Sequence, residues 1–518
     1  MIDTHFSTRD ISFLITGFSC ILLAIGFFHY GKHRLALVTL IAGGFAFRLM
    51  MAFIDPFVNI WDEQFHALVA KNLTLHMFHP TLVENPILPT DPAYWVFTQT
   101  WLHKPPLFLW QMAISIKLFG TSAWAIRMPS VLLSSLMIPA IYQMGLRISN
   151  ERTGFLAALI LTVSNIHVNI VSGFLNTDQN DVVFAAYVLL SFWAWTEYAY
   201  SFKKKWILLV GLFAGAAVLT KWLPGLLVFG AWGVGLVQSK EHRRSFSRWL
   251  HLTAALLIAS LVAFPWFAFV ANKWPEEWGA TLQLYHGHFA EVQGHSGPWW
   301  FHFGEYNSQF GIAFCALTIC SFLVFIRSKN ASMYISYGYA ISVITVFVFY
   351  TFVSARMPLF CLIIVPLLFI MIAYAMNSLL SFWQLRQKRI AHAAAYVICL
   401  WITFSVIDIG RLEHYHTDRD PKEFYRKTRI HNKACFESAS QHVPANAVLF
   451  NCGSWNAVPC MFYTDHTAYD DLPSAEIIRT AQVQKKSIAI FDDGNLPAYI
   501  LQDSSLIILH EQLIRNGF

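Results

Sequence analysis

Long apolar runs separated by short polar loops make up most of the chain. About 20 apolar residues are enough for a helix to cross a bilayer. Such runs fall at residues 11–29, 35–54, 128–147, 153–171, 181–200, 250–271, 305–326, 333–353, 358–380 and 390–408. The stretch 205–238 is also apolar, but Lys221 and Pro224 interrupt it and predict two short spans that meet at Lys221. The pattern predicts a mainly α-helical, polytopic membrane protein with about 12 transmembrane helices.

Basic residues predict the orientation of these spans, because Lys and Arg favour cytoplasmic loops. With about 12 spans, every basic loop falls on the cytoplasmic side. These loops are residues 32–34, 147–152, 203–205, 240–248, 327–329 and 386–389. Both termini and the loops 55–104 and 272–304 then lie outside. The apolar segment 105–119 must begin and end outside, so we expect an interfacial helix there, within a large outer loop at residues 55–127.

Composition agrees with a membrane protein. Of 518 residues, 56% are hydrophobic and only 13% are charged, against about 25% charged residues in soluble domains. The net charge of +6 is spread over short loops, so no nucleic-acid-binding patch is predicted. The eight cysteines show no metal-ligand spacing. Cys452 and Cys460 could pair if their segment faces an oxidising compartment.

The chain changes character after residue 408. Charge rises, and short β-like runs appear at residues 447–450, 487–491 and 506–509, with a helical pattern near 475–485. The sequence therefore predicts a transmembrane domain at residues 1–408, followed by a small external α/β domain at residues 409–518.

Two acids and a lysine flank the predicted interfacial helix. Asp62 and Glu63 directly follow the second span, and Lys104 stands before Pro105 and Pro106, which restrict the direction of its backbone. Carboxylates near a membrane surface can act as general bases or metal ligands, and an ammonium can neutralise a phosphate. A solvated acidic loop and a snorkelling lysine are the alternatives. Together the three side chains favour an anionic lipid phosphate as ligand.

Further ionisable residues are expected on the same side of the membrane. Asp178 and Asp181 lie at the outer start of a span, although either could simply cap its helix. Lys221 lies between two apolar runs, where an ionisable group is by default functional or paired, and it is a candidate for binding the donor phosphate. The alternative is that it marks the turn between two short spans. Arg356, before a later span, is a second candidate for a phosphate contact, or a boundary arginine that snorkels.

Histidines and tryptophans gather in the outer loop at residues 285–300. Tryptophan faces suit sugar rings, and histidine can bind metal, although an interfacial aromatic belt has the same composition. His103 and His286 are therefore candidate ligands for a divalent metal, which is the cofactor that the sequence leaves open. His66 and Trp299, with Asp181, are candidate contacts for a sugar or an acceptor. No Walker loop, Gly-rich dinucleotide turn or HExxH motif is present, so no nucleotide cofactor is suggested.

Seven strings, in order, resemble the polytopic lipid-linked-sugar transferases of the C-type glycosyltransferase superfamily. The resemblance covers roughly residues 35–380 and favours the branch of the lipid A aminoarabinose transferases and protein O-mannosyltransferases. The strings are Asp62-Glu63, Lys104-Pro105-Pro106-Leu107 with Leu118-Phe119-Gly120, Arg127-Met128-Pro129-Ser130, Leu219-Thr220-Lys221, Pro265-Trp266, Gly294 to Trp300, and Ser354 to Pro358.

The resemblance implies a sugar donor on a polyprenyl phosphate, undecaprenyl in bacteria, and transfer to a hydroxyl acceptor at the outer face. It implies Asp62 as the base or the group that positions the acceptor, with Asp178 assisting, and Lys104 as the group that holds the leaving phosphate. Glu63, next to Asp62, is a further candidate catalytic residue. Some members of the superfamily carry a metal and others do not. A bacterial inner membrane with a periplasmic active site is the expected location. A lipid or sugar transporter, or a scaffold without transferase chemistry, is the alternative.

Several positions depart from the aminoarabinose-transferase pattern. Phe65 and His66 stand where that branch often has Arg and Tyr, His103 replaces an acid, and Glu291 replaces an Arg. Some of the residues that the resemblance leads us to expect around the phosphate are thus missing or moved, and Arg356 is the candidate to compensate. The acceptor of the reaction stays open at this point.

Overall fold

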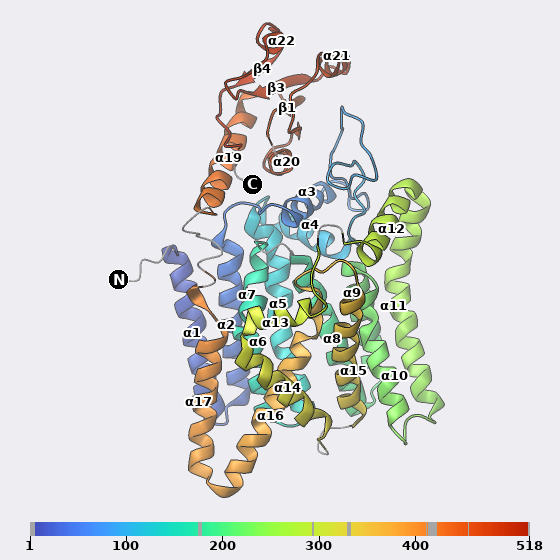
Figure 1. Ribbon diagram of the computed structural model, residues 1–518, viewed down its shortest axis with the longest axis vertical. Helices are drawn as coiled ribbons and strands as arrows, with labels where there is room; N and C mark the ends of the chain where they lie inside the picture. The colour runs from blue at the N-terminus through green and yellow to red at the C-terminus, as the bar shows by residue number, and fades with distance from the viewer. Residues whose placement is uncertain are drawn as a thin grey trace.

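The computed structural model describes residues 6–174, 179–292, 295–328, 333–410, 412, 422–453 and 455–515. Helices account for most of this part of the chain (Figure 1). In the first half they are α1 (Thr8–His29), α2 (His33–Ile54), α3 (Asp62–Leu73), α4 (Leu107–Phe119), α5 (Ala123–Ile148), α6 (Glu151–Val163), α7 (Asn165–Asn169), η1 (Ile170–Ser172), α8 (Gln179–Ser201), α9 (Lys205–Lys221), η2 (Leu223–Leu226) and α10 (Leu227–Gln238). In the second half they are α11 (Phe246–Lys273), α12 (Pro275–Ala290), α13 (Phe301–Phe310), α14 (Ile312–Ile326), α15 (Met333–Phe352), η3 (Phe360–Ile364), α16 (Val365–Arg386), α17 (Lys388–Val406), α19 (Lys422–His442), α20 (Ala457–Tyr463), α21 (Ala475–Val483) and α22 (Ala498–Leu501).

The number of membrane spans differs from the expected twelve. Among the described residues, eight helices are long and apolar enough to cross a bilayer, and up to ten if each bent pair counts as one span. The predicted span 153–171 bends by 55° after Val163, and 305–326 bends by 112° at Gly311, whose φ is 79°. In the stretch 205–238, α9 has 17 residues and α10 has 12, because the chain turns after Lys221 as predicted. Hydrophobic runs located the helices, but helix breaks reduce the number of full-length spans.

Close helix packing holds the bundle together near the turn between α5 and α6. A Cβ added at Gly145 would lie 2.7 Å from the Cα of Gly154, and one added at Gly154 would lie 2.5 Å from the carbonyl oxygen of Tyr142. The two backbones therefore approach more closely than any larger side chain allows. Small residues at helix contacts are typical of membrane bundles, where the lipid is as apolar as the helices.

The C-terminal residues form a parallel sheet. Its strands are β1 (Ala447–Phe450), β2 (Thr467–Ala468), β3 (Ser487–Phe491) and β4 (Ile507–Leu509), in the order β2-β1-β3-β4. The three β-like runs expected from the sequence are thus strands, and α21 covers most of the expected helix near 475–485. Cys452 and Cys460 are buried and unbridged.

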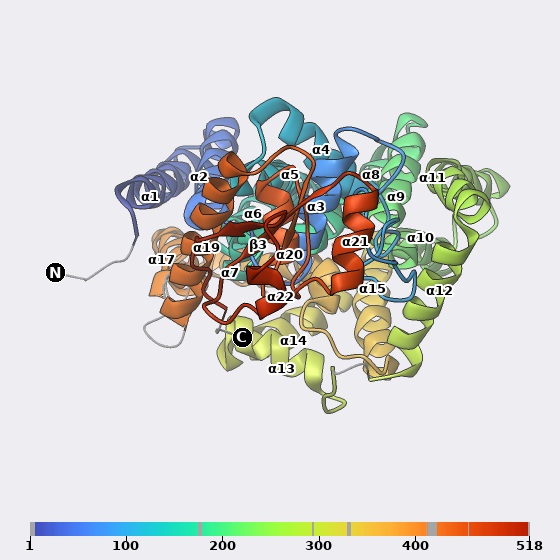
Figure 2. The same cartoon turned by 90° about the horizontal axis from the view of Figure 1, so that it is seen from above.

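The sheet lies above one end of the helical bundle, beside α3 (Figure 1). Seen from above, it overlies the middle of the bundle (Figure 2). The helix α4 has 13 residues, too few to cross a bilayer, and lies at the same end as α3. This end of the molecule, where α3, α4 and the sheet meet, carries the candidate site.

Candidate active site

A cavity of about 870 Å³ lies at this end of the bundle. It gathers side chains from α3, α8, the junction of α9 and η2, α12, and the loops around residues 95–105, 295–296 and 353–360. Six of the residues predicted from the sequence as site residues line it: Asp62, His103, Lys104, Asp181, Lys221 and Arg356. Residues separated by almost 300 positions in the chain therefore meet at one cavity.

Lys104 is a cation of the cavity with neither an ion pair nor a hydrogen bond among the described residues. Among the described residues, no carboxylate lies within ion-pair distance of its ammonium, and no hydrogen bond from it is found. Burial lowers the pKa of Lys104, Asp62 and Asp181 oppose this shift, and Lys221 reinforces it. A half-buried ammonium with no partner costs free energy until an anion binds beside it.

Asp62 lies at the first position of α3, with Trp61 before it at φ 71°. A bulky residue in this left-handed region is unusual and stores backbone strain. The strained turn presents the Asp62 carboxylate to the cavity. No hydrogen bond or ion pair to this carboxylate is found within the described part of the chain, so it can accept a proton from a ligand.

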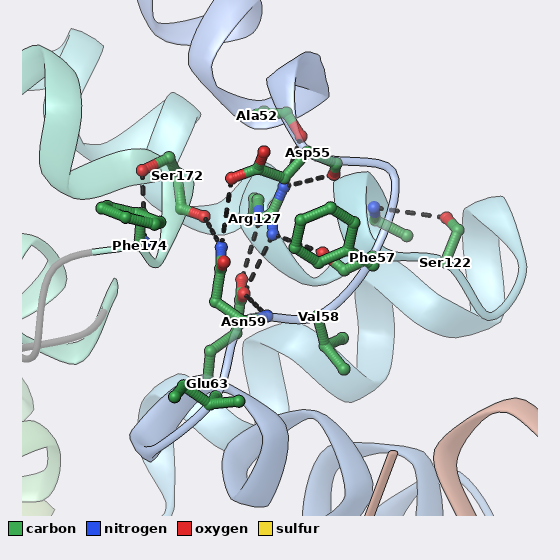
Figure 3. A network of polar contacts seen from close by, with 12 residues as sticks. Ala52, Asp55, Phe57, Val58, Asn59, Glu63, Ser122, Arg127, Ser172 and Phe174 are labelled. Carbon is green, nitrogen blue, oxygen red and sulfur yellow. Dashed lines mark hydrogen bonds and ion pairs between the residues drawn. The ribbon is translucent and has the colours of Figure 1, made fainter. Parts of the chain in front are cut away.

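Glu63, one residue later, does not line the cavity, contrary to the catalytic role predicted for it. Its side chain is completely buried and forms a two-point ion pair with Arg127, at 2.7 Å to Nε and 2.9 Å to Nη2 (Figure 3). It also accepts a hydrogen bond from the backbone N–H of Asn59 at 2.6 Å. These contacts use the carboxylate fully, so the geometry favours a structural role for Glu63.

Arg127 organises the loop that leads to Asp62, and the sequence analysis did not single out its role. Besides Glu63, it donates hydrogen bonds to the carbonyls of Ala52, Asp55 and Phe57 at 3.2, 2.8 and 2.8 Å. An arginine at the start of an apolar run was the available signal, since such a residue is expensive unless it is paired.

The C-terminal segment holds the same loop from the other side. Tyr463 accepts a hydrogen bond from the backbone N–H of Val58 at 2.7 Å, and Tyr425 accepts one from Ile60 at 3.0 Å. Burial raises the pKa of Tyr425 to about 12, so its hydroxyl stays protonated and donates to Asn59 Oδ1 at 3.0 Å. Arg426 pairs with Asp55. The loop is thus clamped between α5 and the C-terminal segment.

Lys221 and Arg356 are already engaged within the protein. Lys221 ends α9 and forms an ion pair with Asp181. Arg356 donates from Nη1 to the carbonyls of Tyr350 and Thr351 at 3.4 and 2.8 Å, which caps the end of α15. Both cations still line the cavity and contribute positive potential there.

Three of the remaining predicted residues, His66, His286 and Trp299, do not line the cavity. His66 is buried against Trp101 and Phe108, where burial, then Lys104 and Lys221, lowers its pKa well below the usual histidine range. His286 is exposed and Trp299 is 65% exposed, and neither lines the cavity. Asp178 lies outside the described residues.

The predicted metal site finds little support. His103 lines the cavity, but its ring stacks on Trp95 at 4.3 Å, and His286 lies elsewhere. No group of three or more His, Cys, Asp or Glu side chains suited to a metal occurs in the part of the chain that the structure describes. The donor set present therefore does not fit a divalent metal, and we derive no step through one.

Comparisons with known proteins find similarity to sugar transferases. The family model for dolichyl-phosphate-mannose-protein mannosyltransferase matches residues 103–268. An undecaprenyl phosphate-alpha-4-amino-4-deoxy-L-arabinose arabinosyl transferase of Pseudomonas fluorescens is 26% identical over 212 residues, which cover 39% of this chain and 37% of that protein. The corresponding transferase of Pseudomonas aeruginosa strain UCBPP-PA14 is 28% identical over 213 residues. The chain spans only about 37% of the length of these curated relatives.

Solved structures show the same fold. The crystal structure of ArnT from Cupriavidus metallidurans bound to undecaprenyl phosphate aligns with a TM-score of 0.63 and 14% identity, over 86% of this chain and 87% of that one. The apo oligosaccharyltransferase of Archaeoglobus fulgidus aligns with a TM-score of 0.53 and 12% identity, over 84% of this chain and 64% of that one. Residues 103–268 are thus similar in sequence to the dolichyl-phosphate-mannose-protein mannosyltransferase family. Most of the chain shares the fold of the solved ArnT and oligosaccharyltransferase structures.

Proposed function

We propose that this protein is a membrane glycosyltransferase that moves a sugar from a polyprenyl-phosphate donor to a hydroxyl acceptor. The observation that carries the proposal is that one cavity holds an ammonium, Lys104, and a carboxylate, Asp62, neither of which has a partner in the part of the chain that the structure describes. The first suits a lipid phosphate and the second suits an attacking hydroxyl. The arabinosyl transferase relatives are named for a sugar linked to undecaprenyl phosphate, and the ArnT crystal structure is bound to undecaprenyl phosphate. Both support the same class of donor.

In the proposed reaction, the donor phosphate lies against Lys104, within the positive potential of Lys221 and Arg356. The acceptor oxygen attacks the anomeric carbon while the bond from that carbon to the phosphate oxygen breaks. The electron pair of that bond leaves with the polyprenyl phosphate, and Asp62 takes the proton of the hydroxyl. Such a single displacement inverts the anomeric centre.

Two effects supply the rate. Lys104 stabilises the charge that grows on the leaving phosphate, and one preorganised donor of this kind contributes about 3 kcal/mol. General-base catalysis by Asp62 contributes about 10²–10⁴-fold. We assign Asp181 to holding Lys221 in place, and Asp178 keeps its predicted assisting role in this proposal.

The proposal places the protein in a bacterial inner membrane, with the cavity on the periplasmic side and residues 409–518 as an external domain. The clamp by Tyr425 and Tyr463 supports a domain on the same side as the loop before α3. The acceptor is a lipid, a glycan or a protein hydroxyl.

Donor binding tests Lys104 directly. We expect Lys104→Ala to weaken binding of undecaprenyl phosphate, measured by native mass spectrometry of the detergent-purified protein, by about 10- to 150-fold. This factor corresponds to the ~1.5–3 kcal/mol of a hydrogen bond to a charged group. Lys117→Ala is the matched control, because Lys117 lies exposed on α4 and outside the cavity.

Transfer tests Asp62. We expect Asp62→Asn to keep donor binding but to lower the rate of sugar transfer by about 10²–10⁴-fold. The rate is measured with a radiolabelled undecaprenyl-phosphate sugar and bacterial membranes as the source of acceptor. Asp91→Asn is the control, because Asp91 is exposed in the segment between α3 and α4. If Lys104→Ala binds and transfers like the unsubstituted protein while remaining folded, the proposed function is wrong. A carrier, by contrast, would move the intact lipid without breaking the sugar–phosphate bond.

A further inference from the structure

A second cavity, of about 410 Å³, lies at the end of the bundle opposite the candidate active site. It is bounded by the end of α1, the link to α2, the start of α6, the end of α16 and the start of α17. In Figure 1 these segments meet at the lower left, far from α3 and the sheet. The basic loops at residues 32–34, 147–152 and 386–389 flank it, so the sequence predicts that this end faces the cytoplasm.

The lining of this cavity is amphipathic. Its polar side chains come from the helix ends, and its apolar ones lie on the faces of α1, α6, α16 and α17. The polar residues are His29, His33, Asn150, Glu151, Arg152, Ser381, Gln384 and His392. The main apolar residues are Ile25, Phe155, Leu156, Leu380, Ala395 and Cys399. One part of the cavity is polar and the other apolar, which matches the head group and chains of a lipid better than a soluble metabolite.

Arg152 is the charge of this cavity that the protein leaves uncompensated. It donates one hydrogen bond to Gln384 Oε1 at 3.2 Å, and no ion pair to it is found among the described residues. The neighbouring Glu151 is instead engaged with the hydroxyl of Tyr142. A half-buried guanidinium with unused donors favours an oxyanion that can accept several hydrogen bonds at once.

A second polar group in the same cavity also lacks a partner. The Nδ1 atom of His33 is buried and has no hydrogen-bond partner, although the ring packs against Phe28 at 4.9 Å. Buried polar atoms in native proteins are nearly always satisfied, by protein, water or ligand. The unused donors of Arg152 therefore indicate that this cavity is completed by a polar ligand, while the buried His33 Nδ1 lies within the cavity wall.

We propose that this cavity binds the phosphate head group of an anionic phospholipid, with the phosphate against Arg152. Basic pockets between transmembrane helices on the cytoplasmic side are typical sites for such head groups. The acyl chains would follow α1 and α17, the outer helices, where Leu22 and Val397 are 46% and 64% exposed. The site lies apart from the candidate active site, so it does not depend on the proposed transfer reaction.

Lipid retention tests the proposal. The protein is reconstituted in nanodiscs of equal parts phosphatidylglycerol and phosphatidylcholine, released, and weighed by native mass spectrometry. We expect selective retention of phosphatidylglycerol, reduced about fivefold in Arg152→Gln, the factor that corresponds to ~1 kcal/mol for one cation near an anionic lipid. Arg244→Gln is the matched control, because Arg244 is an exposed arginine in the loop between α10 and α11, outside the cavity.

A second variant covers the case in which Arg152→Gln fails to fold. Ala395→Phe fills the apolar part of the cavity without changing charge, and we expect it to lower phosphatidylglycerol retention as well. Equal retention of the two phospholipids by the unsubstituted protein, or equal loss in the Arg152 and Arg244 variants, would overturn the proposal. Displacement of phosphatidylglycerol by added undecaprenyl phosphate at this cavity would also overturn it, in favour of a donor-lipid site.

Discussion

Replacing Glu63 by Gln removes one charge from the buried ion pair with Arg127 and changes little else. The guanidinium would stay buried, with its three backbone carbonyl contacts but without a counterion. Breaking a buried pair in this way costs about 3–5 kcal/mol, because an uncompensated charge remains in a low-dielectric environment. An ordinary surface substitution costs at most about 0.5 kcal/mol. The two interpretations of Glu63, structural and catalytic, therefore predict very different stabilities.

The assay is thermal unfolding of the detergent-solubilised protein, at one fixed scan rate because large membrane proteins rarely unfold reversibly. At about 2.1 cal/mol/K per residue, a loss of 3–5 kcal/mol lowers the midpoint of a cooperative 518-residue transition by about 3–5 °C. Glu276→Gln, on the exposed first turn of α12, should leave the midpoint unchanged.

Transfer activity separates the two roles of Glu63. A structural role predicts that Glu63→Gln loses stability and also loses activity, because the loop that carries Asp62 is released. An unchanged melting temperature together with lost sugar transfer would refute our reasoning and make Glu63 a catalytic residue. Removing both charges with Glu63→Leu and Arg127→Met should recover only part of the stability, since the carbonyls that Arg127 holds would lose their donor.

Three further predictions follow from the packing and the charges. Burial lowers the pKa of Lys104, so its ammonium loses its proton below the usual lysine pKa of about 10.4. Binding of undecaprenyl phosphate should therefore weaken as the pH rises through that lowered pKa. Lys104→Arg should keep binding constant to higher pH, and a loss of binding by this variant at the same pH would contradict the prediction. Tyr425→Phe removes the acceptor for a backbone N–H in the loop before α3. It should lower the free energy of unfolding by about 1–3 kcal/mol and expose that loop to proteolysis. The control Tyr499→Phe, in the remote α22, should leave the loop protected. Gly154→Ala would bring a Cβ to 2.5 Å from a carbonyl of α5 and should destabilise by about 1–3 kcal/mol in the same melting assay, while Gly26→Ala, with nothing within 4 Å, should be neutral or slightly stabilising.

Much of the local structure was predictable because it depends on short stretches of sequence. Apolar runs located the transmembrane helices, and the run 447–450 was recognisable as a strand from its composition. The breaks at Ser164 and Gly311 were missed, and they reduce the number of full spans below the expected twelve. A single polar residue or glycine bends a helix only when neighbouring helices favour the bent form, which no local pattern reveals.

Lys104 and Asp62 could be chosen as candidate site residues from the sequence, because both stand beside membrane spans, where charges are costly. Which partner each charge meets depends on the folded chain. Glu63 follows Asp62 directly, yet it meets Arg127 from a distant helix while Asp62 faces the cavity. Successive residues of a helix point about 100° apart, so adjacent carboxylates enter different environments. Pairing is set by long-range packing, which gives Lys221 a carboxylate partner and leaves Lys104 without an ion pair or hydrogen bond among the residues described.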